Sequence, residues 1–341
     1  MNVLITGATG FIGSHLVKVF SKHHRVTVFI RPSSDLRFIS RYSPRVVRGE
    51  FSDSRALSEA LSGQDVVVHT AAMASDWGDY RDFYRVNVEG SLSVIETLPK
   101  GTRMIHVSTN AVLGEEDCPT PKPVDAPRRP RLMYPLESIF PSAMNYYRIS
   151  KCIAEQLIIK RAEQRDIGLT VVRPVWVYGP REFHAGPYEY CQTVLSGVPV
   201  MPGCADNKFQ TVYVEDLAKI ILRISENQSS KVMIYNVGNP EIPTMQDYWG
   251  SWCRALGKAA PRDIPKWLLM PLAFFLEALW TLFGFKTPPL FTRARVEMFY
   301  ASNVYEVKAL IEALAPLPFT SLDRGIRKTI RWWRLYKFLK M

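Results

Sequence analysis

The sequence predicts an α/β fold: a doubly wound parallel sheet with helices on both faces, followed by a smaller C-terminal α/β domain. Apolar runs of strand length alternate with helix-like stretches in the first half of the chain, which is typical of a parallel sheet. These runs are residues 3–5, 25–30, 66–69, 104–108 and 169–173. A glycine-rich turn follows the first run, and the β–α–β unit that it opens is complete within about thirty residues.

The glycine-rich turn is also the first functional signal. Gly7, Gly10 and Gly13 are spaced three apart and lead into a helix-like stretch. Glycines let the backbone approach a pyrophosphate closely, and the first amides of the helix hold its negative charge. We therefore predict a dinucleotide site that includes Gly7, Thr9, Gly10, Phe11, Ile12 and Gly13.

Length and charge limit the class of protein. The chain has 341 residues, 47% of them apolar, which suggests two domains or one large domain with an appendage. The formal net charge is +11, and residues 324–341 carry seven positive charges and no acid. Such a basic tail favours an anionic membrane surface or nucleic acid, or is a solvated helix. We expect no nucleic-acid partner.

The five cysteines are scattered along the chain and form no close pair. Their spacing predicts neither a metal site nor a disulfide framework, and it fits a reducing compartment. The first strand begins almost at the N-terminus, so we expect no signal peptide. The expected location is cytoplasmic, with peripheral contact at the cytoplasmic face of the membrane.

The texture of the sequence changes near residue 175, where strand–helix alternation weakens. We predict a dinucleotide-binding domain over 1–175 with returns near 212–237, namely strands at 212–214 and 233–237. A substrate domain over 176–211 and 238–323 and a basic tail over 324–341 complete the prediction. A long loop rich in proline and charge, over 115–141, should lie at the carboxyl edge of the sheet above the site.

Residues 267–285 are almost wholly apolar, interrupted only by Pro271 and Glu277. A membrane span needs about 20 apolar residues, so the length of this segment is borderline. We favour a helix that lies in the membrane interface or lines a greasy substrate entrance. A core or dimer helix and a true span are the alternatives. With the basic tail over 324–341, this segment predicts peripheral membrane contact.

Tyr147 and Lys151 are the candidate reacting pair. Four residues apart, they share one face of a predicted helix. A nearby ammonium stabilises a phenolate and lowers the tyrosine pKa, so Tyr147 can exchange a proton with a substrate oxygen during hydride transfer. Tyr336 and Lys340 have the same spacing, but they lie in the basic tail and are interpreted as surface or membrane contacts.

Several motifs, in order along the chain, resemble the extended short-chain dehydrogenase/reductases, the NAD-dependent epimerase/dehydratase superfamily with its Rossmann-type sheet. The most similar branch contains 3β-hydroxysteroid dehydrogenases, sterol-4-carboxylate 3-dehydrogenases and bacterial 3-oxo-lipid reductases. The matching segments are 6–13, 68–72 (Val-His-Thr-Ala-Ala), 87–90, 107–114, 147–151, 173–180 (Arg-Pro-Val-Trp-Val-Tyr-Gly-Pro) and 212–216.

The resemblance implies a Thr-Tyr-Lys triad. Thr109 takes the hydroxyl position that hydrogen-bonds the reacting oxygen, Tyr147 is the general acid/base, and Lys151 lowers its pKa and holds the nicotinamide ribose. The implied cofactor-binding residues beyond the glycine turn are Glu50, Phe51, Thr70, Ala71, Ala72, Asn87, Tyr147, Lys151, Pro174 and Val175. Threonine in place of the commoner serine at 109, and Leu113 in place of a common tyrosine, remove no reacting group.

The choice of cofactor depends on the end of the second strand. An acid there suits the ribose 2′-hydroxyl of NAD, whereas an arginine suits the 2′-phosphate of NADP. Arg31, Ser33 and Ser34 lie there, and no acid precedes Asp35. This favours NADP, while an Arg31 that stacks on adenine leaves NAD open.

The favoured function is interconversion of a 3-oxo and a 3-hydroxy group on a hydrophobic substrate, steroid-like or a β-keto lipid. A nucleotide-sugar epimerase shares the fold and the triad, and Arg181, Lys208 and Arg254 are its candidate diphosphate ligands. A 4,6-dehydratase is disfavoured, because Asn110 and Ala111 stand where it needs carboxylates. A catalytically silent dinucleotide-binding protein at a membrane is the third alternative. A homodimer is a further expectation from the resemblance.

Overall fold

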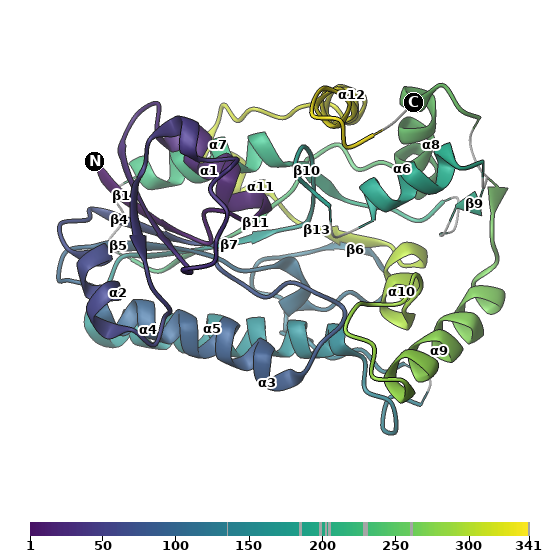
Figure 1. Ribbon diagram of the computed structural model, residues 1–341, viewed down its shortest axis with the longest axis horizontal. Coiled ribbons are helices and arrows are strands. Elements are labelled where there is room, and N and C mark those ends of the chain that lie inside the picture. Colours follow the sequence, from purple (N-terminus) through teal and green to yellow (C-terminus); the bar gives the residue numbers. More distant parts are fainter. Residues whose placement is uncertain are drawn as a thin grey trace.

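One seven-stranded parallel sheet organises the computed structural model of the protein (Figure 1). The strand order is β11-β7-β5-β4-β1-β2-β3, so the order reverses at β1. The strands are β1 (Asn2–Thr6), β2 (Arg25–Ile30), β3 (Arg45–Arg48), β4 (Val66–His69), β5 (Arg103–Val107), β7 (Leu169–Pro174) and β11 (Met233–Val237). The predicted doubly wound sheet is confirmed.

The structure describes residues 1–134, 136–183, 186–197, 200–201, 203, 206–227, 231–259 and 262–339. Cys204 and the last two residues of the predicted tail, Lys340 and Met341, lie outside these ranges.

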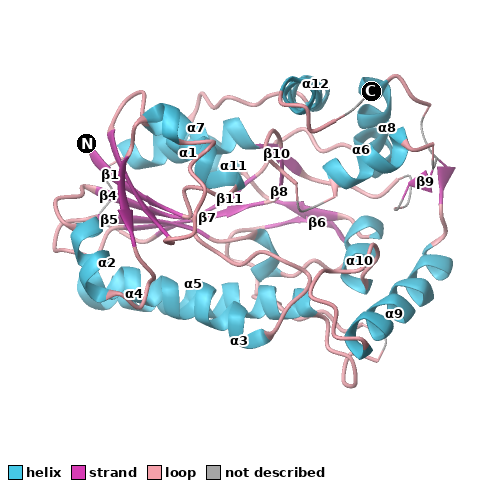
Figure 2. Ribbon diagram, viewed as in Figure 1, coloured by secondary structure: helices cyan, strands magenta, loops and turns pink. Residues whose placement is uncertain are grey.

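Helices cover both faces of the sheet (Figure 2). On one face lie α1 (Phe11–Phe20), α7 (Val214–Glu226) and α11 (Lys308–Leu314), and on the other α2 (Ser54–Leu61), α4 (Gly90–Thr97) and α5 (Ala143–Arg165). Strand β1 shows the cause, because successive side chains point to opposite faces. Val3 and Ile5 join the core formed with α1 and α7, and Leu4 joins the core formed with α2, α4 and α5.

The second part of the chain has an aromatic core of its own. Tyr248, Trp249, Trp252 and Trp333 are fully buried in it. Its elements are β8 (Trp176–Tyr178), α6 (Pro187–Leu195), β10 (Thr211–Tyr213), α8 (Met245–Leu256), α10 (Arg293–Tyr300) and α12 (Leu322–Leu335). Shorter elements are η1 (Ser40–Tyr42), α3 (Tyr80–Phe83), η2 (Tyr84–Glu89), η3 (Asn110–Leu113), β6 (Cys118–Lys122), β9 (Val200–Met201), β12 (Arg262–Asp263) and β13 (Asn303–Tyr305).

One predicted return to the main sheet is wrong. Strand β10 pairs in parallel with β8, outside the seven-stranded sheet, whereas residues 233–237 join it as β11. The chain leaves the main sheet after Pro174, which has no amide to donate to a ladder, and β8 then offers β10 a separate edge. The division of the chain at residue 175 stays a prediction.

The two segments predicted to contact a membrane lie on opposite sides of the molecule in Figure 1, with α9 (Lys266–Leu282) at the lower right and α12 at the top. The apolar face of α12 is not available for lipid: Ile326, Ile330 and Trp333 are buried, and Trp333 stacks on Trp252 with ring centroids 5.5 Å apart. Among the described residues, no helix combines the length and the hydropathy needed to cross a membrane.

Candidate active site

The glycine turn joins β1 to α1 with almost no space around its backbone. Gly7 has a left-handed φ of +67°, which favours glycine, and a Cβ there would lie 2.7 Å from the backbone of Ala71. A Cβ on Gly13 would lie 2.1 Å from the carbonyl oxygen of Gly7. The cap residue Gly10 provides no side-chain cap, and the first turn of α1 holds no acid. The first amides of α1 therefore face outward at the positive end of the helix, which fits a pyrophosphate.

The turn lies at the carboxyl edge of the sheet, where the strand order reverses between β1 and β4. Ligands of open α/β sheets bind at this kind of crevice. The loop after β4 is attached to the turn: Thr6 Oγ1 and His69 Nδ1 are 2.8 Å apart, and the Ala71 amide donates to Thr6 Oγ1 at 3.4 Å. Thr70 and Ala71 therefore lie beside the turn, and the cofactor contact of Thr70, Ala71 and Ala72 stays a prediction.

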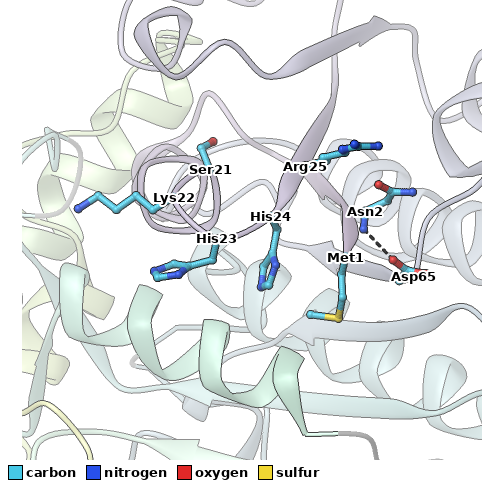
Figure 3. A pocket seen from close by; sticks show the side chains of 8 residues that line it. All are labelled: Met1, Asn2, Ser21, Lys22, His23, His24, Arg25 and Asp65. Carbon is cyan, nitrogen blue, oxygen red and sulfur yellow. Dashed lines mark hydrogen bonds between the residues drawn. The ribbon is translucent and has the colours of Figure 1, made fainter.

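A different hollow lies at the opposite, amino edge of the sheet (Figure 3). It measures about 490 Å³ and is wide open to solvent. Its lining includes Met1, His23, His24 and Asp65, from the starts of β1, β2 and β4. Its position makes it a poor candidate for the dinucleotide site.

Thr109, Tyr147 and Lys151 come together from two elements. Thr109 lies two residues after β5 and caps the short helix η3, with its Oγ1 accepting from the Ala111 amide at 3.2 Å. Tyr147 and Lys151 lie one turn apart on α5. Tyr147 is half-buried, and the Thr109 hydroxyl acts on its phenol and lowers its pKa. Lys151 is buried, and its Nζ donates to the carbonyl of Val107, the last residue of β5, at 2.9 Å.

The pKa of Tyr147 differs from the prediction. Burial raises it to about 12, and the Thr109 hydroxyl only partly opposes the rise. The lowering of this pKa by Lys151 stays a prediction, since in the polypeptide by itself the Lys151 ammonium donates to the Val107 carbonyl. Burial also lowers the pKa of Lys151 to about 8.

Asn87 lies in the π-helix η2, fully buried. Its amide accepts from the Met73 amide at 2.8 Å and donates to Ser150 Oγ at 2.9 Å, so it ties the loop after β4 to the residue before Lys151. Insertions of this kind in helices are frequent at functional sites. Asn87, whose role was the least certain from the sequence, therefore bridges two segments of the candidate site.

The residues predicted at the adenine end differ in their exposure to solvent. Arg31, Ser33 and Glu50 are exposed after β2 and β3. Arg48 Nη1 donates to the Pro32 carbonyl at 2.6 Å and fixes the loop that carries Arg31. Phe51 is half-buried against Phe29 and His69.

At the other end of the crevice, Pro174 closes β7, and the Val175 amide donates to the Val237 carbonyl at 3.0 Å. Val175 is buried, so this segment is a fixed wall of the crevice.

Three basic residues proposed for a diphosphate are not brought together. Arg181 is buried with its guanidinium over the Phe38 ring, 5.2 Å from the centroid. Arg254 is exposed beside Ser251 and Asp323, and Lys208 is exposed next to Ser302. No contact among these three occurs in the part of the chain that the structure describes.

Sequence analysis missed two buried charge clusters next to the triad. Glu155 binds Ser108, Arg128 and Arg173, and Arg148 binds Glu115 at 2.7 Å and the Tyr134 hydroxyl at 2.6 Å. The available signals were weak: Glu155 lies four residues after Lys151, and Arg173 directly precedes Pro174. No metal-binding group of side chains occurs within the described ranges.

Comparison with known proteins agrees with this geometry. The model of the NAD dependent epimerase/dehydratase family matches residues 3–238. The chain is 24% identical to 2-alkyl-3-oxoalkanoate reductase of Stenotrophomonas maltophilia, over 96% of this chain and 98% of the relative. It is also 24% identical to sterol-4-alpha-carboxylate 3-dehydrogenase, decarboxylating, of Mus musculus, over 96% and 89%.

An epimerase is among the relatives as well. The N-acetyl-alpha-D-glucosaminyl-diphospho-ditrans,octacis-undecaprenol 4-epimerase of Escherichia coli O157:H7 is 24% identical, over 97% of this chain and 95% of the relative. The fold is similar to the crystal structure of UDP-glucuronic acid 4-epimerase from Bacillus cereus with NAD, at a TM-score of 0.75, 19% identity and coverage of 98% and 99%. The chain therefore belongs to the NAD dependent epimerase/dehydratase family, and it is an NAD(P)-dependent enzyme.

Proposed function

We propose that the protein is an oxidoreductase that interconverts a 3-oxo and a 3-hydroxy group on a hydrophobic substrate. The observation that carries the proposal is the convergence of Thr109, Tyr147 and Lys151 at the carboxyl edge of the sheet, beside the glycine turn. The glycine turn, the first turn of α1 and the Ala71 region would hold the cofactor, with Pro174 and Val175 at its nicotinamide end. When bound, the cofactor supplies or accepts the hydride.

The protein's own residues handle the substrate oxygen. Thr109 donates a hydrogen bond to this oxygen and orients it toward Tyr147. With its pKa raised to about 12, the phenol keeps its proton at neutral pH, so it acts as proton donor in the reductive direction. The ammonium of Lys151 binds the ribose and stabilises the phenolate that remains.

A β-oxo lipid or a sterol-like ring fits the surroundings of the site. Both named relatives, the 3-oxoalkanoate reductase and the sterol-4-carboxylate dehydrogenase, act at position 3 of a hydrophobic molecule. An apolar surface is attached to the loop after β4: Asp76 accepts from Thr292 Oγ1 at 2.9 Å, and Trp77 donates to the Phe285 carbonyl at 2.9 Å. These contacts attach the segment that follows α9 to the loop after β4.

Helix α9 exposes apolar side chains and buries its one carboxylate, and this arrangement supports contact with lipid. Its carboxylate, Glu277, points inward and pairs with buried Arg293. Its exposed face is apolar, with Trp267 74% and Leu282 80% exposed. The exposed apolar side chains of this surface are Trp267, Leu268, Leu272, Phe275, Leu282, Phe283, Phe285 and Leu290, and we call them the α9 patch. Exposed apolar patches of this kind mark interaction sites.

We propose peripheral membrane contact through the α9 patch, which lets a greasy substrate pass from lipid to the site. Met133, Leu136 and Ile139, also exposed, extend the patch along the neighbouring loop, whose Phe140 packs on Phe274. The basic face of α12 lies on the other side of the molecule in Figure 1, so a flat bilayer on α9 does not need it. A homodimer stays a prediction.

NADP is the favoured cofactor, because exposed Arg31 and Ser33 follow β2 and no acid is close in sequence before Asp35. NAD remains the alternative, with Arg31 stacked on adenine.

The decisive experiment mixes the purified protein in detergent with NADPH or NADH and a panel of 3-oxo lipids, 3-ketosteroids and nucleotide sugars, and follows absorbance of the reduced nicotinamide. We expect the reduced nicotinamide to be oxidised when a hydrophobic ketone is present, and faster with NADPH than with NADH. Conversion of a nucleotide sugar without net change in cofactor would overturn the proposal and establish the epimerase, which the E. coli relative represents.

A further inference from the structure

The carboxylate of Glu155 is the most heavily bonded buried charge near the triad. It is fully buried on α5, one helical turn after Lys151. Ser108 Oγ donates to it at 2.7 Å. Arg173 donates through Nε at 3.0 Å and Nη2 at 2.6 Å, and Arg128 through Nε at 3.2 Å and Nη2 at 3.0 Å. Five donors from three other segments thus converge on one carboxylate.

Two of these partners are next in sequence to a residue of the site. Ser108, the residue after β5, precedes Thr109, and Arg173 precedes Pro174 on β7. The two strands are bonded to each other here, since the Ser108 amide donates to the Val172 carbonyl at 2.7 Å. Displacement of the Glu155 carboxylate therefore moves the threonine, the lysine helix and the nicotinamide wall relative to one another.

Glu155 is also the negative charge that acts on Lys151. The titratable groups that interact electrostatically with the ammonium are Glu155 of α5, His69 of β4 and His106 of β5. Arg173 of β7 and Arg128 of the loop after β6 pair with the Glu155 carboxylate. Burial lowers the pKa of His69 to about 3 and that of His106 far below its usual value, so both are neutral. Two guanidinium groups share the Glu155 carboxylate and weaken its effect on Lys151.

We propose that Glu155 is a positioning residue of the active site. Its carboxylate joins the three segments that carry Thr109, Lys151 and Pro174, and its charge keeps Lys151 in the ammonium form. The inference rests on the proposed role of Lys151. It also implies that Arg128 lowers the pKa of Lys151, whereas Glu155 raises it.

Charge substitutions separate this role from simple packing. Glu155→Gln keeps the shape but removes the charge, so the pKa of Lys151 should fall by about one pH unit. The alkaline limb of the kcat/KM profile should move to lower pH by the same amount, because a rate that needs the ammonium is lost as pH rises through that pKa. Arg128→Gln leaves Glu155 less neutralised and should move the limb to higher pH. Ser108→Ala removes one hydrogen bond without a charge and is the matched control.

The direct readout is a ¹³C NMR titration of lysine ε-carbons in the full-length protein without cofactor, with Lys151 assigned through Lys151→Arg. Opposite displacements in Glu155→Gln and Arg128→Gln are expected. If Glu155→Gln and Arg128→Gln lose kcat equally and the titration of Lys151 moves in neither, the proposal is overturned, and Glu155 has only a packing role. If Glu155→Gln fails to fold, Arg128→Gln alone decides, since the Arg128 side chain is 31% exposed. Displaced titrations in a protein that reduces no ketone would instead reject the proposed function.

Discussion

The carboxyl edge of the sheet and helix α9 differ in which side chains they bury and which they expose. At the sheet edge, polar groups are buried and bonded: Lys151 donates to Val107, Asn87 bridges Met73 and Ser150, and Glu155 collects five donors. On α9 many apolar side chains are exposed and the carboxylate is buried. The comparison teaches that buried hydrogen bonds between α5, η2 and the ends of the strands hold the polar groups of the candidate site in place, whereas α9 presents an apolar face to the outside.

Loss of the phenol at the sheet edge should have the largest effect. Tyr147→Phe removes the proton donor and should lower kcat about 10²–10⁴-fold. The dissociation constant for NADPH, measured by fluorescence titration, should change less than about twofold, because the glycine turn is untouched. Tyr336→Phe, which removes the other tyrosine at this spacing from a lysine, is the matched control and should leave kcat unchanged. Turnover that survives in Tyr147→Phe would show that the assigned mechanism is wrong.

The buried ion pair under α9 should dominate the stability of that region. Breaking a buried pair by removing one partner typically costs about 3–5 kcal/mol. Arg293 keeps its hydrogen bond to the Phe140 carbonyl in such a variant, but it loses the carboxylate that balances its charge. Glu277→Leu should therefore lower the free energy of unfolding in urea by about this amount, and the double variant Glu277→Leu/Arg293→Met should recover most of it. Glu312→Gln, in an exposed pair with Lys308, should change it by less than about 0.5 kcal/mol. A stable single variant would mean that the remaining contacts of Arg293, among them the Phe140 carbonyl, suffice to hold its charge.

The sheet edge was largely predictable, and α9 was predictable only in part. The glycine turn and the spacing of Tyr147 and Lys151 are local patterns whose meaning does not depend on distant residues. The inward turn of Glu277 depends on Arg293, sixteen residues away, and the Glu155 cluster on Ser108, forty-seven residues earlier. Such pairings leave no periodic trace in the sequence.

The packing of α12 could not be predicted, for the same physical reason. Its basic residues suggested a solvated helix or a membrane contact, and both stay predictions. The partner of its apolar face, the aromatic core around Trp252, is supplied only by the fold. The direction of the Tyr147 pKa was also not readable from spacing, because burial outweighs the neighbouring charges.

The exposed face of α9 should govern attachment to lipid. Trp267→Asp/Phe275→Asp replaces two exposed side chains, and because burial of each large apolar side chain contributes about 1.5–3 kcal/mol, binding to phosphatidylcholine vesicles should weaken more than tenfold in a flotation assay. Unfolding free energy should stay unchanged, since both side chains are 61% or more exposed. Arg327→Gln/Arg331→Gln on α12 is the control and should not alter binding to these neutral vesicles. Equal binding by all variants would return α9 to the role of a core or dimer helix.

The smallest expected effect tests selectivity at the far end of the sheet edge. Arg31→Ala removes one exposed charge-assisted contact to a 2′-phosphate, and such contacts contribute about 1.5–3 kcal/mol, with exposure favouring the lower end. The dissociation constant for NADPH should rise about tenfold and that for NADH less than twofold. Arg45→Ala is the matched control, because Arg45 is an exposed arginine of β3 and pairs with Glu59 of α2. An equal loss for both cofactors would mean that Arg31 stacks on adenine, and NAD would then become the favoured cofactor.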